Sequence, residues 1–117
     1  MFHVDRGIAK FKLKLYADAV LDYTQELKVD SSVLLAYYYR SESKVYLKDM
    51  LGAISDLDTY IEKVRISKLD IDLSNTFFNR GLLKIQINKL ESGCLDLSKA
   101  GELGYSKAYE YFQKYCQ

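Results

Sequence analysis

The chain has 117 residues, of which 49% are hydrophobic and 28% are charged, a composition typical of one globular domain. Lysine and arginine number 17 against 16 aspartates and glutamates, so no strong general attraction to nucleic acid is expected. No apolar run approaches the roughly 20 residues that cross a bilayer, and the first ten residues lack the apolar core of a signal peptide. We therefore expect no nucleic-acid partner and no direct membrane insertion.

Cys94 and Cys116 are the only cysteines, and two cysteines in a chain of this size do not make a disulfide framework. We expect Cys94 to pack within a helix and Cys116 to face solvent. This cysteine usage favours an intracellular, reducing compartment over an oxidising one.

Continuous helices are expected along the chain, because it has no proline and is rich in Leu, Lys, Tyr and Ala. Ser31 or Ser32, and Asp72 or Ser74, are candidate N-caps. Gly104 is placed to end the sixth helix in a left-handed conformation. The expected helices span residues 2–14, 16–29, 33–48, 50–64, 71–88, 90–103 and 106–116.

The stretch Lys10–Leu15 reads KFKLKL, and its strict alternation is typical of a half-buried strand or of a basic amphipathic arm. On a helical wheel, however, Phe11 and Leu15 share one face, and Leu13 lies on another. Lys12 lies apart from Lys10 and Lys14, so no basic stripe forms. The repeat described next favours a helix here.

Residues 6–29 match residues 40–63 after a shift of 34 positions, and a further shift of 40 gives a third, weaker copy. The matched positions include an arginine, a lysine, a small residue and an aspartate in each copy. These are Arg6, Arg40 and Arg80; Lys10, Lys44 and Lys84; Ala19, Ala53 and Gly93; and Asp22, Asp56 and Asp96.

With this period, the chain resembles the tetratricopeptide repeat family, whose unit is two antiparallel helices. The resemblance implies an all-α, right-handed superhelical solenoid of about seven helices in a single domain over residues 1–117. Its repeats would span about 1–33, 34–67 and 74–104, followed by a capping helix at 105–117. The family's tryptophan, first-helix tyrosine and closing proline are missing.

Small residues are expected where the two helices of each repeat approach closely, since only small side chains permit that contact. Gly7, Ser41 and Gly81 would face Ala19, Ala53 and Gly93. The last helix would then cover the third repeat with Ala108, Tyr109, Phe112 and Tyr115.

The repeated arginines and aspartates are interpreted as structural ion pairs, either within a repeat or between neighbouring repeats. Catalytic carboxylates would share one cleft, whereas these recur once per repeat. His3 has no cluster of metal ligands around it, and no nucleophile or phosphate-binding motif is present. We predict a non-enzymatic protein without cofactor or metal.

The resemblance also implies that the first helix of each repeat lines a concave groove. Three consecutive tyrosines point about 100° apart on a helix, so Tyr37 is expected to pack, while Tyr38 and Tyr39 either face the groove or pack between repeats. The predicted partner-binding residues are Val4, Ile8, Phe11, Lys12, Leu35, Tyr38, Tyr39, Glu42, Tyr46, Asn75, Phe78, Asn79, Leu82 and Gln86.

The predicted function is a protein–protein interaction module that binds a peptide or a partner helix in this Tyr-rich groove. The alternative is a structural module that self-associates into a homo-oligomer. Family members that bind chaperone C-termini use a clamp of Lys, Arg and Asn. The matching positions here supply no cation, which argues against an acidic carboxylate-terminated ligand; they are Val4, Ile8, Tyr39, Asn75 and Asn79.

Overall fold

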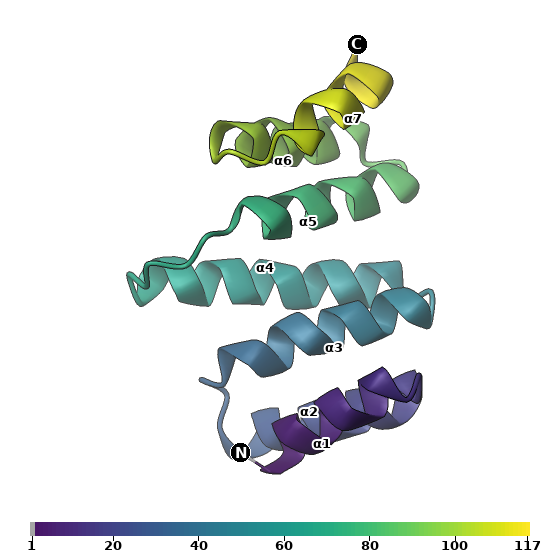
Figure 1. The fold of residues 1–117 in the computed structure, drawn as a ribbon, viewed down its shortest axis with the longest axis vertical. Helices are drawn as coiled ribbons and strands as arrows, with labels where there is room; N and C mark the ends of the chain where they lie inside the picture. The colour runs from purple at the N-terminus through teal and green to yellow at the C-terminus, as the bar shows by residue number, and fades with distance from the viewer. Residues whose placement is uncertain (1) are drawn as a thin grey trace. The chain divides into compact units, whose positions relative to one another are not determined.

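The computed structural model describes residues 2–117, with side chains from Asp5 onward, and these residues form seven α-helices and no strand (Figure 1). The all-α prediction is confirmed, and the expected helices agree with the observed ones to within three residues at each end. The helices are α1 (Phe2–Lys12), α2 (Tyr16–Val29), α3 (Leu34–Tyr46), α4 (Met50–Ile66), α5 (Ser74–Gln86), α6 (Leu90–Glu102) and α7 (Lys107–Cys116).

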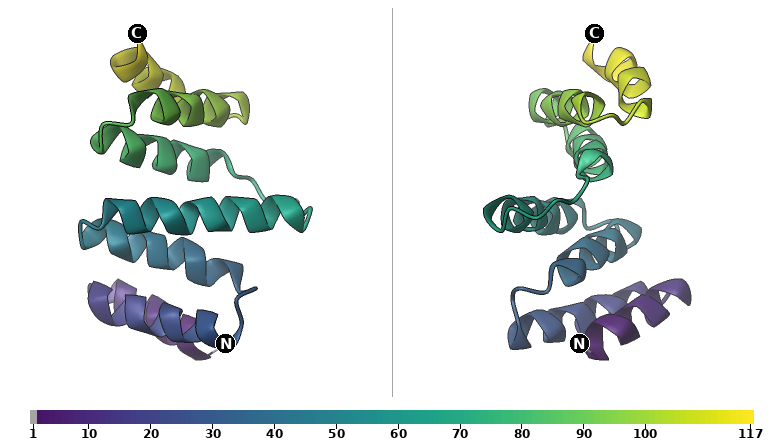
Figure 2. Two further views of the ribbon diagram at one scale, coloured as in Figure 1. Left: turned by 180° about the vertical axis from the view of Figure 1, so that it is seen from behind. Right: turned by 60° about the vertical axis from the view of Figure 1, so that its left-hand side comes forward.

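The chain divides into two compact units, one ending at Leu69 and the other spanning Asp70–Gln117. In the first unit, α1 packs on α2, α2 on α3, and α3 on α4. In the second, α6 lies between α5 and α7 and contacts both (Figure 2). Each unit is therefore built from helices that pack on their neighbours in the sequence.

The core of the first unit includes the predicted small residues Ala19 and Ala53, which are fully buried. Ala36, which the sequence analysis did not single out, and the large side chain of Tyr23 are fully buried as well. Gly7 lies directly under the Tyr23 ring, and a Cβ at this glycine would come within 2.5 Å of Tyr23 Cε1. The close approach of α1 and α2 thus depends on a glycine, although its nearest neighbour is Tyr23 and not Ala19.

The turns between paired helices share one backbone feature. Lys14, Lys48 and Asn88 occupy equivalent positions and all have φ between 63° and 67°. This left-handed conformation is unfavourable for residues other than glycine. The KFKLKL stretch contains the first of these turns, so α1 ends at Lys12. Leu13 is accordingly 70% exposed and does not belong to an apolar helix face.

The helix caps differ in part from the expected ones. Val33 and Leu73 occupy the N-cap positions of α3 and α5, and neither provides a side-chain cap. Ser32 precedes the N-cap of α3 and Ser74 is the first residue of α5, and their backbone amides donate to the carboxylates of Asp30 and Asp72. Gly104 has a φ of 105° after α6, which confirms its left-handed conformation.

In the second unit, α5 and α6 touch at Gly81 and Gly93, as predicted. A Cβ at Gly93 would lie 2.8 Å from the Gly81 carbonyl oxygen. Ala108 and Phe112 of α7 pack on this helix pair as predicted. Tyr109 also contacts the third repeat, since its hydroxyl donates to the Gly101 carbonyl at 3.2 Å, although Tyr109 and Tyr115 are 59% and 39% exposed.

The helix α7 is turned so that Tyr111 and Cys116, together with the preceding Tyr105, pack on Phe78 and Leu97. Aromatic residues occur all around this helix, so the pattern of the sequence does not determine its orientation.

A disulfide joins Cys94 of α6 to Cys116 of α7, with 5.9 Å between the two Cα atoms. The expectation of a packed thiol and a solvent-facing thiol is therefore wrong. The two residues lie 22 positions apart in the sequence, and only the return of α7 onto α6 brings them together. The disulfide also argues against the reducing compartment that the cysteine count favoured.

Candidate functional site

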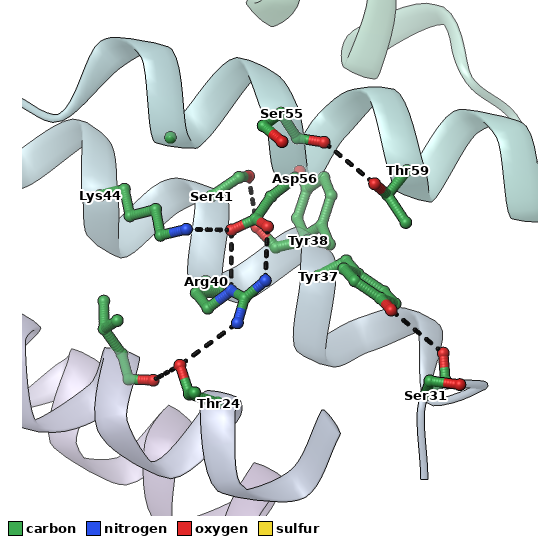
Figure 3. Close-up of polar contacts among 12 residues, drawn as sticks. Thr24, Ser31, Tyr37, Tyr38, Arg40, Ser41, Lys44, Ser55, Asp56 and Thr59 are labelled. Atoms are coloured by element: carbon green, nitrogen blue, oxygen red, sulfur yellow. Dashed lines mark hydrogen bonds and ion pairs between the residues drawn. The ribbon is translucent and has the colours of Figure 1, made fainter. Parts of the chain in front are cut away.

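The repeated arginine and aspartate form an ion pair within each repeat, and Figure 3 shows the pair of the second repeat. Arg40 Nε donates to Asp56 Oδ2 at 2.9 Å, and Nη2 donates to Oδ1 at 2.7 Å. Lys44 Nζ lies 3.0 Å from Oδ2 of the same carboxylate. Asp56 itself is 3% exposed. The charge of this buried carboxylate is compensated by two cations, one of which, Arg40, binds it in bidentate geometry. Such an arrangement is typical of a structural ion pair.

The same arrangement recurs between α5 and α6, where Arg80 and Lys84 bind Asp96 at 2.7 and 3.0 Å. Between α1 and α2 it is looser. Lys10 Nζ lies 3.1 Å from Asp22 Oδ2 but outside hydrogen-bond geometry. The second cation there, Arg6, lies 3.8 Å from the same carboxylate.

The sequence left open whether these ion pairs form within a repeat or between neighbouring repeats, and the structure shows them within each repeat. The repeat also contains a lysine four residues after each arginine, and sequence analysis did not assign it to the ion pair. This spacing could have predicted the assignment, because residues four apart lie on one helix face.

Arg40 also contacts the preceding repeat. Its Nη1 donates to Thr24 Oγ1 at 3.2 Å, and that hydroxyl donates to the Val20 carbonyl at 2.7 Å (Figure 3). One guanidinium therefore joins α2, α3 and α4.

The three consecutive tyrosines of α3 have different environments. The Tyr37 hydroxyl donates to the Ser31 carbonyl, and the side-chain cations of Arg40 and Lys63 each lie 5.8 Å from the ring centroid. Tyr38 and Tyr39 are both half-buried. All three rings are therefore partly packed, and none is wholly exposed.

Tyr38 and Tyr39 belong to a group of four rings that we call the tyrosine cluster: Tyr23, Tyr38, Tyr39 and Tyr60. The Tyr38 ring lies edge-on to Tyr39 and also contacts Tyr60, each at a centroid distance of 5.5 Å. Tyr39 stacks on Tyr23 at 6.3 Å. The half-buried rings of Tyr38 and Tyr39 thus pack on the buried rings of Tyr60 and Tyr23.

A carboxylate lies beside this cluster. Burial raises the pKa of Glu42 above its ordinary value, and a hydrogen bond from the Tyr38 hydroxyl partly opposes the rise. Burial, followed by the nearby Glu42, raises the pKa of Tyr38 to about 12. The pKa of Tyr23 is also raised, by burial first and by its neighbours Tyr39 and Glu42 next. Burial is thus the main cause of the raised pKa at all three residues.

Solved structures similar to this chain share one architecture. No family model and no curated protein matches the sequence. The N-terminal domain of stress-induced protein-1 (STI-1) from C. elegans has a TM-score of 0.87 at 15% identity, covering 98% of this chain and 92% of its own.

The first TPR domain of Spaghetti (RPAP3), bound to an HSP90 peptide, has a TM-score of 0.84 at 22% identity, covering 99% of this chain and 89% of its own. The second TPR domain of human RPAP3, in complex with an HSP70 peptide, has a TM-score of 0.80 at 24% identity, covering 98% and 92%.

This chain has the tetratricopeptide-repeat fold. The predicted fold class is thereby confirmed, and the expected groove residues all belong to α1, α3 and α5, the first helices of the three repeats.

In the first two TPR repeats, the expected groove residues differ in exposure. Ile8 and Phe11 are half-buried and pack against the core around Ala19 and Tyr23, whereas Lys12 is exposed. Leu35 and Tyr46 are 51% and 59% exposed. The side chain of Val4 lies outside the described side chains.

Tyr46 adds a second aromatic contact at the other end of α3. Its ring stacks on Tyr16 at 4.4 Å and meets Phe11 edge-on at 5.7 Å. The α3 helix thus carries aromatic side chains towards both of its ends.

In the third TPR repeat, Asn75 and Gln86 are exposed, and Asn79 and Leu82 are half-buried. Phe78, which sequence analysis assigned to the groove, is 6% exposed. Its ring packs on Tyr105 at 4.7 Å and on Tyr111 at 5.2 Å. It is a core residue because the helix α7 covers it.

Other site chemistries find no support in the part of the chain that the structure describes. Residues 5–117 contain no group of three His, Cys, Asp or Glu side chains that could hold a metal ion. None of the described helices is both long enough and apolar enough to cross a membrane.

Proposed function

We propose that this chain is a protein–protein interaction module that binds a peptide or a partner helix on the first-helix face of its first two repeats. We call this surface the α3 face; it comprises Ile8, Phe11, Leu35, Tyr38, Tyr39, Glu42 and Tyr46. The observation that carries the proposal is the half-exposed pair Tyr38 and Tyr39, flanked by the exposed Leu35 and Tyr46.

The physical reason is that tyrosines fixed by packing make efficient contacts. Aromatic side chains dominate the energetics of protein interfaces, because they bury large areas with few rotatable bonds. Tyr39 is already ordered by its stacking on Tyr23, and Tyr38 by Tyr60. A partner would therefore bind these rings at little further cost in side-chain entropy.

The comparisons support binding of protein segments in general. The TPR domains of RPAP3 are solved with HSP90 and HSP70 peptides, and so is a TPR domain pair of yeast Sti1 with an HSP90 ligand. In this chain, the positions that matched the family's cationic clamp hold Ile8, Tyr39, Asn75 and Asn79 among the described side chains. We infer a peptide-binding function with a different ligand chemistry.

The test is selection of a displayed library of random peptides on the intact chain, followed by affinity measurements. Tyr39→Ala should weaken the selected peptides about tenfold or more, as truncation of an interface hot spot does. Tyr39 also packs on the core, so Leu35→Ala provides a second variant at a half-exposed position, with an expected loss of several-fold.

Tyr109→Ala is the matched control, since Tyr109 is an exposed tyrosine of α7. It should leave peptide affinity unchanged. Peptides that bind Tyr39→Ala and Leu35→Ala as tightly as the parent would exclude the α3 face. A concentration-dependent dimer in light scattering that Leu35→Ala abolishes would assign the same face to self-association.

A further inference from the structure

We propose that the segment bound on the α3 face presents a basic side chain, Arg or Lys, to Glu42 beside the tyrosine cluster. This inference rests on the proposed function and specifies its ligand. The α3 face would thus prefer a basic ligand, whereas the family's cationic clamp binds an acidic one.

Glu42 interrupts an apolar row. The equivalent positions in the other two repeats, 34 residues earlier and 40 residues later, hold Ile8 and Leu82. An acid among apolar and aromatic neighbours costs desolvation energy unless a partner compensates it. The raised pKa of Glu42 reflects that cost.

No resident cation compensates Glu42. Within residues 5–117 its carboxylate receives a hydrogen bond from Tyr38 and forms no ion pair. Arg40 and Lys44, the cations two residues away on the same helix, both bind Asp56. On α1, Arg6 and Lys10 pair with Asp22. The three buried aspartates are thus all matched by cations, while Glu42 is not.

The rings around Glu42 suit a cation. Tyr38 and Tyr39 stand edge-on to each other at 5.5 Å, and Glu42 follows them by one turn of α3, so the two rings and the carboxylate are neighbours on one side of the helix. Aromatic faces attract guanidinium and ammonium groups, more strongly where water is excluded.

The carboxylate of Glu42 is the group that would receive the cation. Glu42 is only partly buried, and its carboxylate can accept two N–H groups of a guanidinium in bidentate geometry. The Tyr23 hydroxyl has no hydrogen-bond partner among the described residues, but Tyr23 is 0% exposed, so an incoming side chain would not reach it.

The direct test is an NMR titration of the isotope-labelled intact chain with ethylguanidinium and, separately, with acetate. Ethylguanidinium should give saturable shifts at the amides of Tyr39 and Glu42, whereas acetate should give none there. Glu42→Gln should weaken ethylguanidinium binding about tenfold, because a charge-assisted hydrogen bond is lost. Glu62→Gln removes the same charge from an exposed part of α4 and should leave the titration unchanged.

Peptide selection provides a second, independent test. Peptides selected on the parent should be enriched in Arg or Lys, and Glu42→Lys should exchange that enrichment for Asp or Glu. Replacing the enriched basic residue by Gln should weaken the peptide about tenfold on the parent and leave its affinity for Glu42→Gln unchanged.

The outcomes separate the two proposals. Peptides that require Tyr39 and Leu35 but carry no basic residue would overturn this inference and leave the proposed function standing. Saturable ethylguanidinium binding that depends on Glu42, with no peptide enriched, would sustain the cation site and refute the peptide-binding function. Equal shifts with acetate, or an unchanged titration of Glu42→Gln, would overturn the cation site.

Discussion

Asp56 receives charged hydrogen bonds from Arg40 and an ion pair from Lys44. Asp56→Ala leaves both cations facing a void, with side chains only 17% and 19% exposed. Breaking a buried ion pair from one side costs about 3–5 kcal/mol, which urea unfolding would measure.

Asp22→Ala is the comparison within the same chain. Its partners Arg6 and Lys10 have side chains that are 56% and 36% exposed, at 3.8 and 3.1 Å from the carboxylate, so the expected loss is smaller, about 1 kcal/mol. Equal losses for the two variants would contradict the assigned difference in burial and geometry.

The pKa of Glu42 is raised in the folded chain, which fixes the sign of its effect on stability. The folded state binds the proton on Glu42 more tightly than the unfolded state does. The resulting contribution to the free energy of unfolding is fully present below the unfolded pKa and is lost as pH rises through the folded pKa. Glu42→Gln imitates the protonated form.

We therefore expect Glu42→Gln to melt at a higher temperature than the parent at neutral pH. The two melting temperatures should converge at about pH 3.5, where both side chains are neutral. Thermal unfolding followed by circular dichroism would measure both. A lower melting temperature for Glu42→Gln at neutral pH would be inconsistent with an uncompensated carboxylate.

At the scale of the element, the contact between α5 and α6 depends on two glycines. A Cβ at Gly93 would lie 2.7 Å from Ile85 Cγ1 and 2.8 Å from the Gly81 carbonyl oxygen, and the backbone oxygen cannot move aside. Gly93→Ala should therefore cost about 2–3 kcal/mol through overpacking.

Gly101→Ala in the same helix is the matched control. Its Cβ would meet the ring of Tyr109 at 3.0 Å, and that exposed side chain can move. The gain in helix propensity of up to about 1 kcal/mol should then make the variant neutral or more stable. Chemical denaturation of both variants decides the point, and similar losses would argue against a glycine-dependent contact between α5 and α6.

The turn after α3 places Lys48 at a φ of 63°. Glycine adopts this conformation without the steric cost that a Cβ imposes. Lys48→Gly is expected to stabilise the chain by about 0.5–1 kcal/mol, after the greater unfolded-state entropy of glycine is included. The same change at the helical Lys44 should destabilise, so a loss at both positions would refute the turn conformation.

Particular residues show how far sequence reasoning reaches at this scale. Arg6, Arg40 and Arg80 recur with their aspartates, so the period predicted the helix pairs and the presence of ion pairs, but not whether each ion pair forms within a repeat or between two repeats. The orientation of α7 could not be derived, because aromatic residues surround it. Phe78 was consequently assigned to the groove, whereas α7 buries it.

Two site features also required the three-dimensional structure. The isolation of Glu42 depends on where Arg40 and Lys44 point, and residues two apart on a helix point to different sides. The Cys94–Cys116 disulfide depends on the return of the last helix, which no spacing of two cysteines reveals.

At the scale of the whole molecule, that disulfide closes a loop of 22 residues between the start of α6 and the end of α7. Loop closure of this length corresponds to about 3 kcal/mol in the chain-entropy model. Reduction, or replacement of both cysteines by serine, should lower the melting temperature and remove hydrogen-exchange protection from α7.

Protection within α1 and α2 should change less, because their contacts lie within the first unit. Identical exchange of the α7 amides in the oxidised and reduced chains would show that the disulfide does not stabilise this helix.

Arg40 has a consequence for how the first unit unfolds. In a linear array, stability is the sum of the stability of each repeat and of the coupling between neighbours. Arg40 belongs to both terms, because the guanidinium that binds Asp56 within its own repeat also binds Thr24 of the preceding one. The first repeat is therefore coupled to the second by this guanidinium as well as by the stacking of Tyr39 on Tyr23 and of Tyr46 on Tyr16, and we expect the two repeats to unfold together.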